Sequence, residues 1–441
     1  MNIVSRLRVT ALAIMATVAA VYPAATVAAV ASKVYDLLIR PLISPDLTAR
    51  GVFGANTLTG LIPTLYVALD TVAREFIGFI PSVARDANFS RAAKGQTITS
   101  FIAPPAVAAD ITPGVTAPND GDQVFGSFPL TITKSRYVPV RWNGEEQLAL
   151  AGGNGIGQAS MLTQQFVQAF RTLANEMEND MAVTAYKAAS RAVGTAGTAP
   201  FGVANDLTDF ANAAGALDVN GAPIGDRHLI VNAAAMTNIR GKQSVLFKVN
   251  ESGTSDLLRN GIIGRAEGFD IGYAPAIKAV VKGTGAAYVT SGTFAIGAVS
   301  IPLITGTGTV LAGDVVTFAG DTNKYVVGTG IAAPGTIVLN SPGLLQALGS
   351  GVAMTIGANF TPNIAFQRNG LILATRLPAV PVDINGNAQD MADDRMTMVD
   401  PFSGIAFEIS LYRQYRQIKY EIGLAWGTGV TKSDFVINLL G

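Results

Sequence analysis

Residues with the chemistry needed for catalysis are few in this 441-residue chain, which has no cysteine and a single histidine, His228. The lack of cysteine excludes disulfides, thiolate metal sites and cysteine nucleophiles. One histidine cannot build a histidine-rich zinc or iron site, and a Ser-His-Asp hydrolase would have only His228 as its base. Because His228 opens an apolar run, we interpret it as a histidine at the edge of the core. A hydrolase that uses His228 stays open as a third alternative.

A glycine-rich segment, Gly152–Gly157, stands between a predicted strand and a predicted helix, where a phosphate-binding loop would sit. Its sequence, GGNGIG, lacks the GxGxxG spacing, and no Lys-Ser or Lys-Thr pair follows it. A flexible joint ahead of the helix is therefore the favoured interpretation.

Two acidic groups could be carboxylate sites. Glu145 and Glu146 are adjacent, and neighbouring residues on a strand point to opposite faces, so we expect a solvated or intersubunit ion pair. Asp383–Asn387 (DINGN) resembles the start of a calcium loop, but Ala388 and Asp394 stand where that loop needs glycine and glutamate. A turn explains this segment better. The sequence thus predicts no catalytic, cofactor-binding or metal-ligating residue, and no cofactor.

The composition favours a protein with covered surface. Hydrophobic residues make up 49% of the chain and charged residues only 14%, which indicates an extensive oligomeric interface. Lysine plus arginine equal aspartate plus glutamate at 31 each, and no basic stripe is present. A dedicated nucleic-acid-binding protein is therefore not expected.

The amino-terminal residues have the features of a secretory signal peptide. Arg6 and Arg8 precede an uncharged run, Val9–Ser32, which contains the small-x-small motif Ala29–Ala31. An alanine-rich helical extension, or a wrongly assigned start, would also explain them. A transmembrane anchor fits less well, because alanine is weakly apolar and Pro23 interrupts the run.

The spacing of apolar residues predicts the main elements. A short amphipathic helix is expected from Pro63 to about Phe79, followed by an extended stretch from Gly95 to Pro118. A long helix is expected between Gly157 and Gly194, where apolar residues recur every three or four positions. Those residues are Leu162, Phe166, Phe170, Leu173, Met177, Met181 and Ala185. A helix of this length without heptad partners should lie across a sheet as a spine.

Residues 280–357 form a β-only segment rich in glycine, threonine and valine, which predicts a small barrel or sandwich. The flanking segments, Gly268–Val281 and Asn359–Asp383, have the pattern of one domain interrupted by this insert. Within the second flank, Ile364–Arg368 is expected to be helical. The carboxyl-terminal residues predict a β meander with a hairpin turn or bulge at Arg413–Arg416.

This order of elements resembles that of the major capsid proteins of tailed bacteriophages, which have the Hong Kong 97 type fold. More narrowly, it is similar to the Salmonella podophage coat proteins, whose apical domain carries an inserted β-barrel. The resemblance covers residues 54–441, and residues 1–53 have no counterpart in it. The segments that carry it are Leu58–Ile80, Gly268–Asp270, Gly313–Gly320 and Gly423–Gly427.

The resemblance implies an α+β fold and a structural role without catalysis. The expected parts are an extension (1–53), an N-arm (54–94), an extended loop (95–150), a peripheral domain (151–200 and 390–441), an axial domain (201–279 and 358–389) and an inserted β-barrel (280–357). It also implies self-assembly through pentamers and hexamers into an icosahedral shell in the host bacterial cytoplasm. Scaffolding and portal proteins and packaged double-stranded DNA, bound without sequence specificity, are the implied partners, and no membrane is involved. The alternative is a secreted or envelope-exposed β-rich binding protein with a signal peptide.

Overall fold

The computed structural model describes residues 58–73, 78–102, 108, 110–111, 113–114, 126–151, 158–243, 246, 264–385, 389–401 and 403–441. The chain divides into two compact units, Met1–Tyr66 and Val67–Gly441. In the first unit, the described residues form the 3-10 turn η2 (Leu58–Leu61) and the start of helix α5 (Ile62–Ala73). The remaining elements belong to the second unit.

The helices of the second unit are mostly short. They are α6 (Phe79–Ser82), α7 (Gly144–Ala151), α8 (Gln158–Ala188), α9 (Thr208–Val219), α10 (Ala233–Lys242) and the 3-10 turns η4 (Arg368–Gly370) and η5 (Ser433–Phe435). The helix predicted from Pro63 to about Phe79 is shorter in the structure, where α5 ends at Ala73 and Phe79 begins α6. None of the helices in the described ranges has both the length and the apolar composition needed to cross a bilayer.

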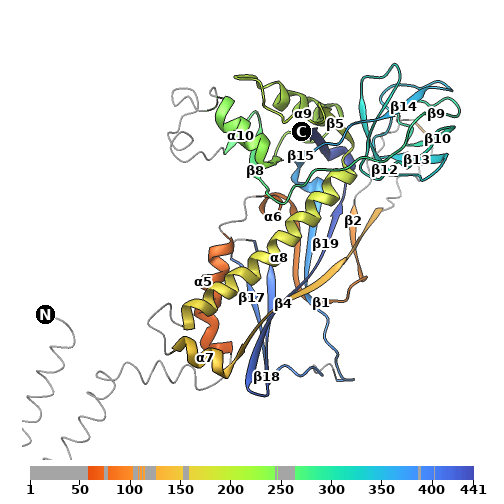
Figure 1. The fold of residues 1–441 in the computed structure, drawn as a ribbon. Coiled ribbons are helices and arrows are strands. Elements are labelled where there is room, and N and C mark those ends of the chain that lie inside the picture. The colour runs from red at the N-terminus through yellow and green to blue at the C-terminus, as the bar shows by residue number, and fades with distance from the viewer. Residues whose placement is uncertain are drawn as a thin grey trace, which may run out of the picture. The chain divides into compact units, whose positions relative to one another are not determined.

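One sheet has the strand order β1-β16-β19-β18-β17, with β4 on the other edge of β19 (Figure 1). Its strands are β1 (Ala84–Ala92), β4 (Lys134–Asn143), β16 (Leu371–Pro378), β17 (Asp394–Val399), β18 (Ala406–Gln414) and β19 (Gln417–Val430). Strands β18 and β19 form a hairpin in which Gln414 pairs with Gln417, so the turn predicted at Arg413–Arg416 is confirmed.

Helix α8 packs along this sheet and carries the predicted apolar stripe. The Phe166 ring meets Tyr420 of β19 edge to face at 5.5 Å, and the Phe170 ring meets Phe407 of β18 at 5.1 Å. At 1.5 Å per residue, its 31 residues span about 46 Å. The helix ends at Ala188, earlier than the sequence predicted, because residues 191–194 join a second sheet as strand β5.

The second sheet contains β5 (Arg191–Gly194), β20 (Val436–Leu440), β15 (Pro362–Gln367), β6 (Arg227–Val231), β8 (Phe269–Tyr273) and β7 (Arg265–Ala266) in that spatial order. Helices α9 and α10 share a hydrophobic core with it, formed around Phe210, Leu229 and Phe269. The helix predicted for Ile364–Arg368 is wrong: residues 362–367 form a central strand buried on both faces, so they lack the alternation that marks a strand in sequence.

The expected carboxyl-terminal meander is also wrong in its last strand. Strand β20 leaves the sheet of β18 and β19 and pairs antiparallel with β15 and parallel with β5. Apolar residues that are buried in any sheet would give the same pattern, so composition could not reveal which neighbours β20 has.

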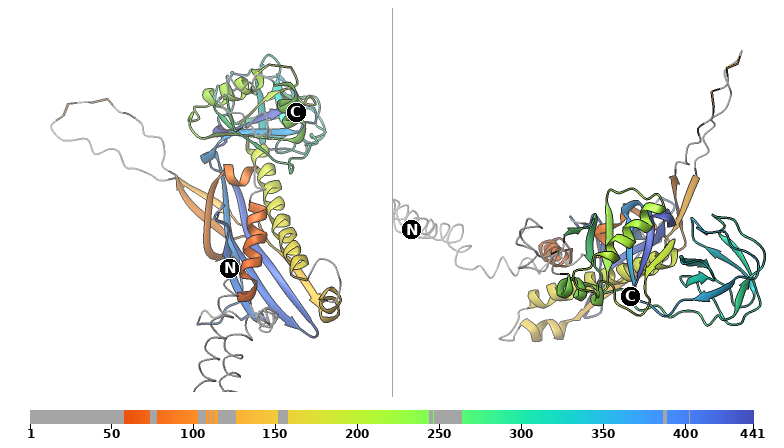
Figure 2. Two further views of the ribbon diagram at one scale, coloured as in Figure 1. Left: turned by 90° about the vertical axis from the view of Figure 1, so that its left-hand side faces the viewer. Right: turned by 90° about the horizontal axis from the view of Figure 1, so that it is seen from above.

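Six strands between Tyr288 and Ile356 close into a ring. They are β9 (Tyr288–Thr290), β10 (Ser300–Ile304), β11 (Val315–Phe318), β12 (Lys324–Thr329), β13 (Gly335–Leu339) and β14 (Ala353–Ile356). The order β11-β14-β9-β10-β13-β12 is closed by pairing of β12 with β11. A core that includes Tyr288, Ile301, Val316 and Ile337 fills the ring, and its members come only from this segment. Figure 2 shows the ring from two further sides.

This closed ring of six strands, called the barrel below, is joined by hydrogen bonds to β5 and to the end of α8. Strand β12 pairs with β5 through Lys324 and Tyr325. The Asn340 side chain donates to the carbonyl oxygens of Lys187 and Ala189, at 2.9 and 2.7 Å, and so supplies hydrogen bonds to the last turn of α8. The barrel thus has its own core but shares a short ladder and a cap with the rest of its unit.

We expect Phe166→Ala and Phe170→Ala each to lower the free energy of unfolding by about 3–5 kcal/mol, because both rings are fully buried and their removal leaves cavities. Denaturant unfolding of the purified protein measures the loss. Gln164→Ala, on the exposed face of the same helix, is the control and should cost less than about 0.5 kcal/mol. Equal effects at the three positions would contradict this packing.

We expect residues 280–358 to fold as an isolated fragment, since their core is internal. In the full chain a β-bridge between Val280 and Phe360 shows that the two ends of the segment lie close together. Circular dichroism should show strand structure, and amide resonances should be dispersed. Loss of the β5 ladder should cost stability without abolishing the fold. A random-coil spectrum would show that the barrel depends on its host.

Candidate functional site

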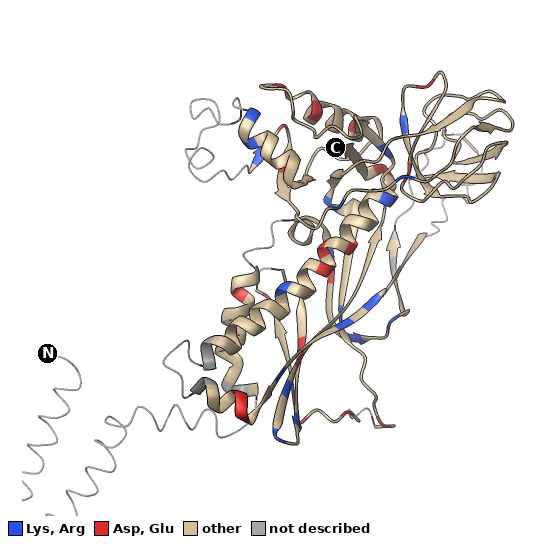
Figure 3. Cartoon of the chain, in the orientation of Figure 1, with Lys and Arg blue, Asp and Glu red and all other residues tan. Residues whose placement is uncertain are grey.

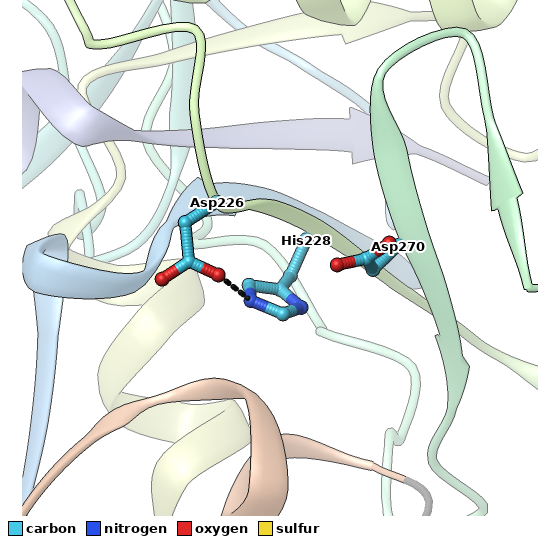
Figure 4. A group of neighbouring side chains, drawn as sticks. All are labelled: Asp226, His228 and Asp270. Carbon is cyan, nitrogen blue, oxygen red and sulfur yellow. Dashed lines mark hydrogen bonds and ion pairs between the residues drawn. The ribbon is translucent and has the colours of Figure 1, made fainter.

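A histidine lies between two aspartates at the margin of the second sheet (Figure 4). His228 in β6 and Asp270 in β8 are register partners in a parallel pair. Asp226 precedes β6 with a φ of 59°, a left-handed conformation that aspartate adopts more readily than most residues. Its Oδ1 lies 3.0 Å from His228 Nε2. One ligand atom from each residue lies within 4.8 Å of the others, a spacing that could hold a metal ion.

A guanidinium already occupies the neighbourhood of this cluster. Arg368 of η4 places its Nε 3.3 Å from Asp226 Oδ2 and its Nη2 3.5 Å from His228 Nε2. This fixed positive charge repels a cation and neutralises the carboxylate that the cation would need. The arrangement is therefore explained better as an ion-pair cluster that joins β6 to η4 than as a metal centre.

The protonation of His228 follows from its burial. Burial lowers the pKa of His228 below its usual 6.5, the hydrogen bond that His228 donates to Asp226 opposes that effect, and the Arg368 charge lowers the pKa further. The imidazole is thus neutral at pH 7 and could in principle accept a proton. Its side-chain hydrogen bonds in the described part of the chain go to Asp226 and Arg368, neither of which is a nucleophile. The cluster has no arrangement for acyl transfer.

The adjacent glutamates do not lie on a strand, so that prediction is wrong. Glu145 and Glu146 are in the first turn of α7. The Glu146 amide donates to Asn143 Oδ1 at 2.7 Å, and the Asn143 amide donates to Glu146 Oε2 at 3.0 Å. This reciprocal pair is a capping box, and Glu146 therefore has a structural role at a helix start.

The other candidates are resolved only in part. The Asn385 amide donates to Asp383 Oδ1 at 2.9 Å, as in an aspartate-initiated turn. Asp394 begins β17. Residues 386–388, which complete the calcium-loop pattern, and the glycine-rich segment 152–157 lie outside the described residues.

An open depression of about 640 Å³ lies between the loop after β5 and helix α10. Two of its polar side chains, Asp209 and Asn238, bind the protein's own backbone. The Asp209 carboxylate accepts from the Phe201 amide at 2.6 Å, and Asn238 donates to the Pro200 carbonyl at 3.0 Å. Since these groups turn to the backbone, they do not converge on a ligand.

A two-stranded ribbon, β2 (Thr97–Ile102) and β3 (Gly126–Thr131), projects from the first sheet (Figure 2). Its base packs against the sheet through Leu130 and Ile132, which share a small core with Ala374 and Ala425. Further out, Phe101 is 78% exposed. The ribbon is thus held at its base and carries apolar surface at Phe101 that is exposed in the described part of the chain.

One tryptophan contacts the base of the ribbon, the first sheet and helix α8. Trp426 of β19 donates through Nε1 to Asp180 of α8 at 2.9 Å, and its carbonyl accepts from the Thr133 amide at 3.0 Å. Lys134 lies over its ring and contacts Asp180 and Glu176 at 2.8 and 2.9 Å. The sequence analysis missed Asp180, because its position on a polar helix face gave no signal.

We expect the His228 pKa to rise in Arg368→Gln, because removal of the guanidinium takes away a charge that disfavours the imidazolium. In Asp226→Asn it should fall further below 6.5, because the hydrogen bond that favours the charged form is weakened. Since the chain has one histidine, a single imidazole NMR signal reports the titration. Lys278→Gln, outside the cluster, is the control. An unchanged pKa in Arg368→Gln would contradict the contact.

The chain is similar in structure to capsid proteins, with low TM-scores and low sequence identities. It aligns with a structure from Mycobacterium phage Che8 (TM-score 0.42, 12% identity, 78% of this chain and 85% of the other) and with the capsid of the cyanophage P-SCSP1u (0.42, 11%, 80% and 86%). It also aligns with a virus-like particle from Pyrococcus furiosus (0.38, 9%, 86% and 98%). No family model matches the chain, and no curated protein matches it in sequence. These values do not establish a family, so functional inference depends on the chain's own architecture.

Proposed function

We propose that this protein is the major capsid protein of a tailed double-stranded DNA bacteriophage or prophage, and that it assembles into an icosahedral head. The observation that carries the proposal is the ribbon β2–β3, which extends from a rigid base formed by β19 and α8. The base holds the ribbon in position, and the ribbon has the exposed surface to bind a second copy.

The ribbon requires a partner for a physical reason. A two-stranded ribbon without a covering layer is marginally stable in water. Phe101 in β2 is 78% exposed, and Tyr137 on the edge strand β4 is 55% exposed. Covering such residues with a neighbouring copy would remove apolar surface from water in each contact, and a closed shell repeats that contact many times.

The remaining parts fit the same function. Helix α8 and strands β17, β18 and β19 would belong to the peripheral domain (151–200 and 390–441), and α9, α10, β6, β8 and β15 would belong to the axial domain (201–279 and 358–389). The barrel (280–357) would be the inserted domain, residues 54–94 the N-arm and residues 95–150 the loop over a neighbour. The narrower kinship with the Salmonella podophage group rests on the closed barrel ring.

The charges suit a container better than a nucleic-acid-binding protein. Lysine and arginine balance aspartate and glutamate, and in Figure 3 the two signs are interspersed over the described elements. Packaged DNA would accordingly be confined without sequence-specific contacts. Scaffolding and portal proteins are the expected partners, and the host cytoplasm is the expected place of assembly. Nothing in the described residues favours the alternative of a secreted binding protein.

We expect the full chain, produced in bacteria, to form closed shells that are visible by negative-stain microscopy and elute in the void volume of a sizing column. Replacement of residues 98–130 by a short Gly-Ser linker should give soluble subunits that form no closed shell, because the ribbon that contacts the neighbouring copy is missing. The linker can replace the ribbon because Thr97 and Thr131 are paired partners. Unchanged circular dichroism would show that the subunit still folds.

A point variant tests the contact more finely. Phe101→Asp places a charge on the exposed ribbon and should reduce shell yield by at least tenfold. Val219→Asp is the matched control, since Val219 is a similarly exposed apolar residue on α9. A full chain that stays monomeric with and without candidate scaffolding protein would overturn the proposed function.

A further inference from the structure

Glu178 of helix α8 is a buried carboxylate that holds a segment nearly one hundred residues away. Its Oε2 accepts the Phe79 amide at 2.7 Å and its Oε1 accepts the Ile80 amide at 2.8 Å. Both oxygens of one side chain therefore bind the first turn of α6, which follows residues 74–77 in the chain. Glu178 itself is 8% exposed.

The segment that Glu178 binds has a glycine, Gly78, where the carboxylate needs space. A Cβ atom at Gly78 would lie 2.6 Å from Glu178 Oε2 and 3.0 Å from its Cδ, so any larger residue would displace the carboxylate. Phe79 is fully buried and stacks on Phe366 of β15 at 6.1 Å. The Ser82 hydroxyl donates to the Gly78 carbonyl at 3.0 Å and closes the turn. The contact is thus specific to residues 78–83.

No positive charge compensates Glu178 within the described residues. Glu176 and Asp180, on the same helix, bind Lys134 of β4, so that lysine is already committed. On the β15 side, His228 lies behind the Phe366 ring, with ring centres 5.7 Å apart. The environment acts on Glu178 through burial and the two amide hydrogen bonds, with no contribution from another charged group.

We propose that Glu178 and residues 78–83 form a proton-controlled latch, in which ionisation of the buried carboxylate favours release of α6 from α8. The closed segment is most stable when Glu178 is neutral, because a neutral carboxyl group loses little on leaving water and its carbonyl oxygen still accepts one of the two amides. When Glu178 is ionised, the two amides offset only part of the lost hydration, and release returns the charge to solvent. The latch belongs to the single chain and does not rest on the proposed function.

The direction of the pH dependence follows from burial. Burial raises the pKa of Glu178 from 4.5 to about 7 in the closed state, while the Ile80 and Phe79 amides oppose this rise. In the open state the group is solvated, and its pKa returns towards 4.5. The stabilisation of the closed state is therefore complete below pH 4.5 and is lost as pH rises through about 7. The opening equilibrium should increase on the order of 100-fold across that range.

Hydrogen exchange of the full chain, followed by mass spectrometry between about pH 5 and pH 9, tests this latch. After correction for the intrinsic exchange rate, protection of peptides containing Phe79 and Ile80 should fall by that factor as pH rises. Peptides from β20, within the buried second sheet, should show no such change. Constant protection of the α6 peptides would overturn the proposal.

Two variants assign the effect to Glu178. Glu178→Gln cannot ionise, so its α6 peptides should show no pH dependence, and an undiminished response in this variant would also overturn the latch. Gly78→Ala displaces the carboxylate and should leave α6 weakly protected at every pH, which provides a second measurement if Glu178→Gln fails to fold. Glu176→Gln changes a neighbouring carboxylate that is paired with Lys134 and should keep the wild-type response.

Discussion

The packing of helix α8 on the sheet of β18 and β19 is the interaction on which the other features depend. It buries Phe166 and Phe170 against aromatic residues of the two strands, and two different faces of the same helix supply Asp180 and the buried Glu178. Asp180 fixes Trp426 beside the base of the ribbon, and Glu178 holds the entry of α6. A shift of α8 along the sheet would therefore disturb the core, the ribbon and the α6 contact together.

The barrel has few charged residues, and those few are bound within the protein. All of its residues are described, and between Gly283 and Gly357 only Asp314, Asp321 and Lys324 are charged. Asp314 is buried and accepts amides of Gly283 and Leu311. The Asp321 carboxylate accepts from Tyr325, and Lys324 contacts the Gly194 carbonyl. The barrel exterior is consequently almost free of ionic groups, as Figure 3 shows.

Sequence periodicity predicted those elements whose burial is one-sided. The stripe of α8 and the turn between β18 and β19 could be read because polar and apolar residues alternate with a clear period. Residues 362–367 could not, since both faces of β15 are covered and its polar and apolar residues do not alternate. The glutamates at 145 and 146 were misplaced because their helix is short and its capping partner, Asn143, ends the preceding strand.

The histidine cluster shows the same limit at the level of side chains. His228 was placed correctly at the edge of the core, because a polar residue opens an apolar strand there. Asp270 and Arg368 lie 42 and 140 positions after His228 in the chain. They reach it only because β6 pairs with β8 and β15. Nothing in the local sequence records such a register, so the partners of an isolated titratable residue come from topology.

The position of β20 has a consequence for how the nascent chain acquires its structure. This strand lies between β5 and β15, yet Ile437 pairs with Arg191, which is synthesised about 250 residues earlier. The second sheet therefore stays divided, with exposed edges on β5 and β15, until β20 has left the ribosome. The barrel encoded between them can close first, because its contacts are local. The order of synthesis thus delays the sheet and leaves the edges of β5 and β15 open to aggregation until β20 has been made.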